Sequence, residues 1–304
     1  MIRAGLLAVL LAGPVAAAEP CPAAWDKVTA GLASFGAVGG GVRQDGDWCL
    51  VEDLVLDMDG QYLPDWHIDR LRFRGGAVGW LAGDAAAPDS LELVAEGLRL
   101  VIETGHAQTD WLLAAQARGN AIRVEASLSW DAATRVLRLE GLGIDFPGDN
   151  MVELSAEARG VDLSSTGAMQ MSVASFAVTA AELKVTTHGL FEGYLLMPLG
   201  AALLPAEGDV AAAAEALRSD LVAAVATLPE SSFPSASKDA LLALIATLPN
   251  PAGVLTVALR AEPGIGPARL AGPLLHGMPQ SVADAAQLFS GVVVDVGWSA
   301  SDAQ

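Results

Sequence analysis

Asp65, His67 and Asp69 are the best-placed group of chemically active side chains in the sequence. Residues two apart in an extended strand point to the same face, so these three side chains would lie together. A histidine between two carboxylates could transfer protons or contribute to a weak divalent-ion site. The same alternation also fits a solvent-facing polar row opposite Trp66 and Ile68, and we favour this second interpretation.

Three other motifs each lack part of the pattern that their chemistry requires. The run Asp57–Gln61 is similar to a calcium loop, but its glycine is fourth rather than sixth and no glutamate stands at position twelve. Ser235 and Lys238 have the Ser-x-x-Lys spacing without its companion motifs, and Ser235 is better interpreted as a helix N-cap. Gly39–Gly41 lacks the lysine of a phosphate-binding loop. No histidine has a metal-ligand spacing: His67, His106, His188 and His276. The sequence therefore predicts no catalytic, cofactor-binding or metal-binding residue.

The first eighteen residues have the layout of a secretory signal peptide. Arg3 gives a positive start, Leu6–Leu11 form an apolar core, and Ala16 and Ala18 are the small residues that precede a cleavage site. The apolar run is too short to span a bilayer as a helix. We therefore expect cleavage after Ala18 and a periplasmic location.

Cys21 and Cys49 are the only cysteines. An even number of cysteines in an exported chain predicts a disulfide, which here would be worth roughly 3 kcal/mol from loop closure. A lipidated Cys21 is the alternative. It is disfavoured because Glu19 and Pro20 are not the small residues that a lipoprotein signal places before its cysteine.

Composition excludes several classes of protein. The formal net charge is −19 and there is no basic run, which argues against binding to nucleic acid or to an anionic surface. Only 17% of the residues are charged and 52% are hydrophobic, so the chain has enough apolar material to fold. After removal of the leader, no apolar segment is long enough for a transmembrane helix.

The region from Trp48 to about His188 has the texture of an antiparallel sheet. Short runs of β-branched and aromatic residues alternate with turn residues, and most runs are not separated by a helical pattern. We expect strands at 48–58, 66–74, 90–102, 121–130, 135–146, 151–163, 168–178 and 181–188. Gly97, Gly141 and Gly160 lie where the apolar residues of three strands change parity, so we expect bulges or bends with positive φ there and a strongly curved sheet.

Helical periodicity precedes and follows this region. We expect helices at 20–38, 190–204, 209–228, 235–248 and 280–289, and late strands at 254–259 and 292–298. After the signal peptide (1–18), residues 19–47 would form a helix and a joint. Residues 48–304 would form one α+β domain, with the sheet at 48–188, helices at 189–250 and closing strands at 251–304. The expected fold is a curved antiparallel sheet with bulges, packed by C-terminal helices and closed by a late strand.

The strand texture and the runs Thr187–Glu192 and Leu248–Val257 resemble those of uncharacterised exported bacterial envelope proteins with repetitive antiparallel sheets. The resemblance covers residues 90–270. It implies an exported, sheet-rich, non-enzymatic envelope component, and it carries over no catalytic residue.

The leading functional hypothesis is a periplasmic binding or envelope-assembly protein. Its ligand would be apolar or lipid-like if the apolar residues exceed what one core can bury, and the alternative is that all of them are core. These residues are Trp66, Trp80, Trp111, Trp130, Trp298 and the segment Leu190–Leu204. A groove between the sheet and the helices of 190–248 would hold an acyl chain. The alternatives are a structural protein-interaction module without a cavity and a hydrolase whose site is not visible in the sequence.

Overall fold

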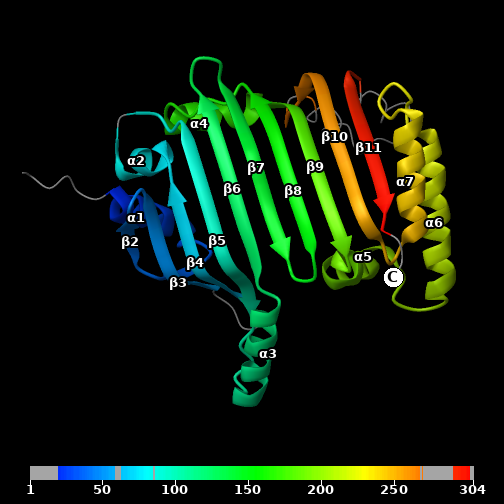
Figure 1. The fold of residues 1–304 in the computed structure, drawn as a ribbon, viewed down its shortest axis with the longest axis horizontal. Helices are drawn as coiled ribbons and strands as arrows, with labels where there is room; N and C mark the ends of the chain where they lie inside the picture. The colour runs from blue at the N-terminus through cyan, green and yellow to red at the C-terminus, as the bar shows by residue number, and fades with distance from the viewer. Residues whose placement is uncertain (1–19, 59–62, 85, 268, 270–289, 302–304) are drawn as a thin grey trace, which may run out of the picture.

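The structure is a computed structural model that describes residues 20–58, 63–84, 86–267, 269 and 290–301. An 11-stranded antiparallel sheet forms its body, in the order β1-β3-β4-β5-β6-β7-β8-β9-β10-β11, and β2 pairs with β3 beside β1 (Figure 1). From β3 to β9 each strand pairs with its neighbour in the sequence. The expected α+β class with an antiparallel sheet is confirmed.

The strands are β1 (Gly36–Gly39), β2 (Val42–Asp45), β3 (Trp48–Met58), β4 (Asp65–Arg74), β5 (Ser90–Val101), β6 (Ile122–Asp131), β7 (Val136–Phe146), β8 (Asn150–Arg159), β9 (Ala177–His188), β10 (Ala252–Ile265) and β11 (Val292–Ala300). The helices are α1 (Pro20–Leu32), α2 (Gly76–Ala82), α3 (Ala107–Gly119), α4 (Thr166–Ser175), the π-helical turn η1 (Phe191–Leu195), α5 (Leu196–Leu203), α6 (Val210–Thr227) and α7 (Ser235–Thr247). Among these helices none is long and apolar enough to cross a membrane.

Strand register gives the sheet one apolar face and one polar face. Residues that pair side by side form one continuous apolar row across nine strands: Cys49, Phe73, Leu93, Ala126, Leu142, Leu154, Leu183, Val257 and Val296. Apart from Val94, the adjacent row on the opposite face is polar or glycine: Arg72, Val94, Glu125, Gly143, Glu153, Lys184, Thr256 and Gly297. This alternation is the period of two that the sequence contains.

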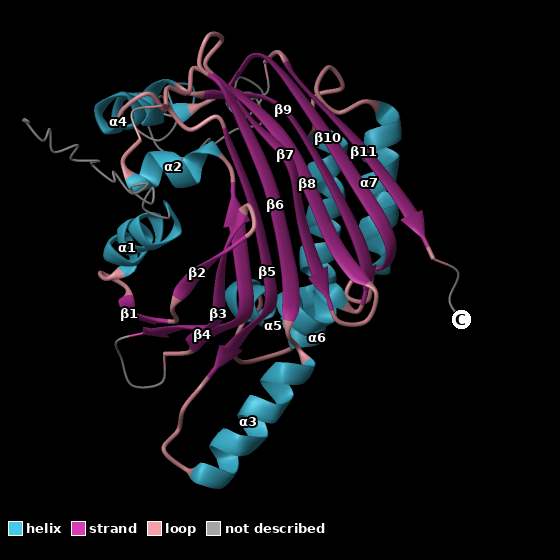
Figure 2. Cartoon of the chain, turned by 60° about the vertical axis from the view of Figure 1, so that its left-hand side comes forward, coloured by secondary structure: helices cyan, strands magenta, loops and turns pink. Residues whose placement is uncertain are grey.

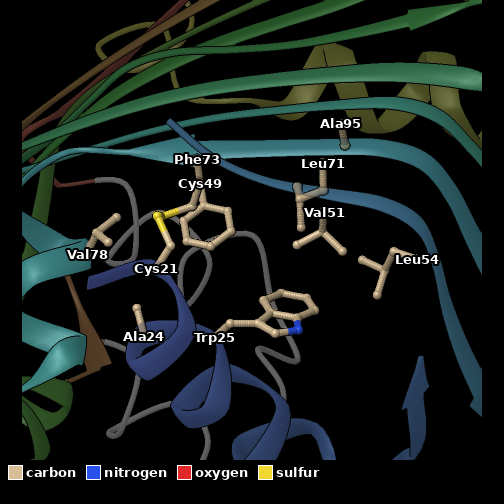
Figure 3. Packing of buried hydrophobic residues seen from close by; sticks show 10 residues of the cluster. All are labelled: Cys21, Ala24, Trp25, Cys49, Val51, Leu54, Leu71, Phe73, Val78 and Ala95. Atoms are coloured by element: carbon tan, nitrogen blue, oxygen red, sulfur yellow. A yellow bond between two sulfur atoms is a disulfide. The ribbon is translucent and has the colours of Figure 1, made fainter. Parts of the chain in front are cut away.

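The apolar face has a buried core near the start of the sheet. Trp25 of α1 stacks on Phe73 with ring centroids 6.2 Å apart, and its indole Nε1 donates to the carbonyl of Gly40. Cys21 and Cys49 form the expected disulfide, which ties α1 to β3 (Figure 3). Val51 beside them is fully buried. Helix α1 is therefore fixed to the sheet both covalently and by packing.

A second core lies at the other edge of the sheet, where Phe233 packs with Ala261, Val292 and Val294. The α6–α7 connection also satisfies backbone groups of β11. The N–H of Val294 donates to the carbonyl of Ser232, and the N–H of Val296 donates to Oγ of the buried Ser237. An unprotected edge strand invites pairing with another chain, and these contacts occupy part of that edge.

Several predicted elements are wrong. Residues 168–178 were expected to form a strand, but α4 covers most of this segment. Ser165 starts that helix by accepting a hydrogen bond from the N–H of Ala168. The helix expected at 20–38 ends at Leu32, and β1 and β2 follow it. Helices α2 and α3 were not expected.

The C-terminal helices agree better with the sequence pattern. Helix α6 begins after Asp209, whose carboxylate accepts from the N–H of Ala212. In α7, however, Pro234 is the N-cap and Ser235 is already helical, so the N-cap assigned to Ser235 is wrong by one residue. The segment 190–204 is interrupted, with η1 followed by α5. The helix expected at 280–289 lies outside the described residues.

The three parity-switch glycines behave differently. Gly97 has φ 74°, in the left-handed region, and the β5–β6 register shifts beside it. Gly141 also lies at a register shift, in β7, but its φ is not positive; the strand absorbs an extra residue without a left-handed conformation. Gly160 has φ 75°, yet it follows the last residue of β8, so it ends a strand rather than bending one.

Candidate functional site

The two carboxylates of the polar row predicted on β4 have different hydrogen-bond partners. Asp65 accepts a hydrogen bond from the N–H of Met58, at 3.0 Å. The carboxylate of Asp69 binds Nη1 of Arg99, at 2.6 Å. His67 pairs in the sheet with Val55 and Arg99. Within the described part of the chain, no group of three or more His, Cys, Asp or Glu side chains could hold a metal ion. The polar-row interpretation fits these contacts better than a catalytic group.

Two of the other histidines lie at the ends of different elements. His106 is the N-cap residue of α3, and His188 is the last residue of β9. His276 lies outside the described residues. Ser235 and Lys238 lie in the first turn of α7, where the N–H of Lys238 donates to the carbonyl of Pro234.

An apolar cavity of about 440 Å³ lies where α3 meets the end of the sheet. It is lined by Trp66, Leu98, Arg99, Leu100, Ile102, Leu113, Gln116, Ala117, Asn120, Ile122, Phe146 and Tyr194. Three of these side chains are polar, namely Arg99, Gln116 and Asn120. We call this cavity the α3 pocket.

Strand pairing builds the floor of the α3 pocket. Trp66 of β4 lies opposite Leu100 of β5, and Leu98 of β5 lies opposite Ile122 of β6. Ile122 keeps the parity of Ala126 in the apolar row, and the register shift between Ala95 and Leu98 turns Leu98 to the same face although its own parity has changed. The pocket is therefore an extension of that face toward the end of the strands.

Helix α3 forms one wall of the pocket with Leu113, Gln116 and Ala117. The turn before the helix holds it near β5. The carboxylate of Asp110 accepts hydrogen bonds from the N–H and from Oγ1 of Thr104, both at 2.7 Å. The side-chain hydrogen bond from Thr104 makes the larger contribution and the backbone bond the smaller one, and both lower the pKa of Asp110 below its ordinary value. The carboxylate is therefore charged at neutral pH, and the turn keeps these hydrogen bonds.

Tyr194 of η1 forms the opposite wall, and its ring meets the ring of Phe146 edge-on. Burial raises the pKa of Tyr194 because the charged phenolate is less well solvated there than in water. The sequence analysis expected a groove between the sheet and the helices of 190–248. In the α3 pocket, Tyr194 is the lining residue from that region, and the main helical wall is α3.

The signal that could have revealed α3 is local. Thr104 and Asp110 flank a glycine and a histidine, and the run Trp111–Ala115 contains no helix breaker. Its apolar residues lie on more than one side of the helix. The segment therefore lacks the single apolar stripe from which the other helices were predicted.

A separate open groove of about 930 Å³ lies on the sheet and is lined by residues of both rows, for example Leu142, Leu154 and Glu153. Lys184 lies in it and binds Glu153 at 2.7 Å. The acidic side chains that line the groove are Glu92, Glu125, Glu140, Glu153, Glu182 and Asp295. This groove is consequently acidic, whereas the α3 pocket is apolar.

No family model matches the chain, and a comparison with curated proteins finds no relative.

Proposed function

We propose that the protein is an exported, periplasmic binding protein for an apolar, lipid-like ligand, which it takes up in the α3 pocket. The observation that carries this proposal is the cavity of about 440 Å³, whose lining is apolar except for Arg99, Gln116 and Asn120. Pockets for small ligands commonly combine such a volume with few polar groups. In this proposal the C-terminal helices cover part of the apolar face, and β11 completes the domain as its last strand.

The lining of the pocket indicates which ligand would fit. Each buried methylene of an acyl chain contributes about 0.8 kcal/mol, so a chain of several methylenes offsets the cost of association. Arg99 supplies a cationic donor for a carboxylate or phosphate at the end of the chain. Its Nη1 is held by Asp69 and by the carbonyl of Gly97, which orients the guanidinium before the ligand arrives.

Export is supported by the disulfide between Cys21 and Cys49, since such bonds persist in oxidising compartments. The signal-peptide pattern of residues 1–18 supports it independently. Edman sequencing of the mature protein should begin at Glu19. An N-terminus that still includes residues 1–18, or an acylated Cys21, would contradict this part of the proposal.

The ligand hypothesis is tested with delipidated protein and a fluorescent fatty acid in buffer without vesicles. Ala117 lines the pocket and Ala226 is exposed on α6, so Ala117→Trp fills the cavity whereas Ala226→Trp is a matched control. We expect the wild type and Ala226→Trp to bind the probe and Ala117→Trp to bind at least tenfold more weakly. A wild-type protein that gives no response, and that carries no extractable lipid, would refute the proposal.

A second candidate, a protein-interaction module, is supported by the acidic groove on the sheet. Its carboxylates outnumber Lys184, so a basic segment of an envelope protein would complement it. Glu182→Lys with Asp295→Lys would weaken such a complex and leave fatty-acid binding unchanged. Capture of a partner that these substitutions do not affect would argue against this candidate.

A further inference from the structure

We propose that the end of the molecule formed by α3 and α5 docks on the surface of an electrically neutral phospholipid bilayer. The inference rests on the proposed function, because the α3 pocket lies at this end and would exchange its ligand with the bilayer. Leu113 and Ala117 of α3 and Tyr194 of η1, the turn that directly precedes α5, line that one pocket. The docking end and the binding site are thus the same part of the fold.

Large apolar side chains are exposed in unusual number at this end. Trp111 is 66% exposed and Met197 is 79% exposed. The other exposed apolar side chains on α3, η1, α5 and the adjoining chain are Trp66, Leu100, Ile102, Leu112, Tyr194, Leu195, Leu199 and Leu203. Exposed apolar residues that gather in one region, rather than lying singly, mark an interaction surface.

Helix α3 is apolar on two sides, although one side packs on the protein. Leu113 and Ala117 face the pocket, whereas Trp111 and Leu112 are exposed. No residue of α3 is buried, and the helix extends away from the sheet (Figure 2). A helix with this pattern lowers its free energy when its second apolar side is also removed from water.

Charge favours a neutral lipid surface as the occupant. The whole chain carries a formal charge of −19, yet this end has few charges. Helix α5 contains no charged residue, α3 contains Asp110 and Arg118, and η1 contains Glu192. Six carboxylates line the acidic groove instead. The weakly charged end can therefore approach a zwitterionic surface closely, whereas an anionic surface would repel the rest of the molecule.

The shape of this end also fits a bilayer better than a second copy of the chain. Helix α3 projects by itself, and α5 lies near the ends of β9 and β10 (Figure 1). A rigid partner would need a surface that complements both projections. A bilayer interface adapts to separate apolar insertions, and tryptophan is favoured at that depth.

Vesicle flotation with a charge-matched control tests the inference. In the test protein, Trp111→Glu is combined with Met197→Glu. In the control, Met171→Glu is combined with Val173→Glu on α4, at the opposite end of the sheet, where the two side chains are 76% and 66% exposed. With phosphatidylcholine vesicles, we expect the wild type and the control to float and the test protein to lose at least tenfold in bound fraction. Adding phosphatidylglycerol at low salt should weaken wild-type binding.

Three outcomes would overturn docking on a bilayer. The first is that the wild type does not float, and the second is that the test and control proteins float equally. The third is that the wild type forms a dimer, does not bind vesicles, and becomes monomeric when Trp111→Glu is introduced. Fatty-acid binding measured without vesicles separates this inference from the proposed function. If the protein binds the fluorescent fatty acid but does not float with the vesicles, the docking inference fails and the ligand hypothesis stands. If the protein does not bind the fatty acid, the ligand hypothesis fails.

Discussion

The ring of Tyr194 meets the ring of Phe146 edge-on, with the ring centroids 4.9 Å apart and the ring planes at 61°. This contact joins η1 to the last residue of β7 and closes one side of the α3 pocket. Such aromatic pairs are worth about 0.5–1.5 kcal/mol beyond the area that they bury. The contact therefore fixes the wall of the pocket to the end of the sheet.

Tyr194 is only partly buried, with 41% of its surface exposed, so removing Phe146 should expose it further and lower its pKa. Burial holds that pKa above the ordinary value of 10.0, so Phe146→Ala should return it toward this value. Because the unfolded chain loses the tyrosine proton first, stability should fall as pH rises above about 10. The measurement is the ultraviolet absorbance of tyrosinate in a Tyr62→Phe background, which leaves one tyrosine of the two. An unchanged titration in Phe146→Ala would contradict the burial of Tyr194 by that ring.

Removing the disulfide should destabilise the whole domain. The bond between Cys21 and Cys49 spans 28 residues, and in the loop-entropy account such a bond is worth roughly 3 kcal/mol. We expect the double substitution Cys21→Ala and Cys49→Ala to lower the free energy of unfolding by about this amount in urea denaturation. An equal midpoint and slope for both proteins would mean that α1 is held by packing alone.

Two glycines at register shifts should respond differently to the same substitution. Gly97 has positive φ, and a Cβ there would contact the carboxylate of Asp69, so Gly97→Ala should cost about 1–2 kcal/mol. Gly141 has no positive φ, and nothing lies within 4 Å of the position of its Cβ, so Gly141→Ala should stay within about 0.5 kcal/mol of the wild type. Thermal unfolding of both variants distinguishes them, and equal losses would contradict this difference.

The pKa of Asp110 should depend on Thr104. Since hydrogen bonds from Thr104 lower it below the ordinary 3.8, Thr104→Val should raise it toward that value. The stabilisation that this carboxylate provides is present above pH 3.8 and is lost as pH falls through the lower pKa of the folded state. The carboxyl ¹³C shift followed against pH measures the change. Asp131, whose pKa is lowered by Thr134, is the internal control and should not move.

The sheet was largely predictable because its alternation is a local signal. The predicted strands at 48–58, 66–74, 90–102, 121–130 and 135–146 correspond to β3 through β7. The prediction of secondary structure was wrong where the same residues fit both the alternation of a strand and the spacing of a helix. In α4, the alternating Met169, Met171 and Val173 fit a strand, but the hydrogen bond at Ser165 starts a helix instead.

The candidate site was less predictable than the fold. Leu98 and Ile122 lie in the predicted strands 90–102 and 121–130, and the strand pattern alone does not indicate which strand ends a helix would leave uncovered. The α3 pocket depends on α3, whose apolar residues lie on two sides and so give no single stripe. By contrast, Asp69 was assigned to a polar row by spacing alone, and its actual partner, Arg99, is thirty residues away in the sequence.

The order of strands in the sheet has a consequence for the way the chain is made. From β3 to β9, every strand finds its partner in the segment synthesised just before it, whereas β10 pairs with β9 across the whole of η1 and α5–α7. Contacts between sequence neighbours form quickly, and distant ones form slowly. In the export that we propose, the chain would leave a translocation channel with its N-terminus first, and the strands up to β9 would assemble during passage. The edge of β9 would then stay unpaired until β10 has been synthesised. During this interval the molecule is most prone to pair incorrectly with another copy.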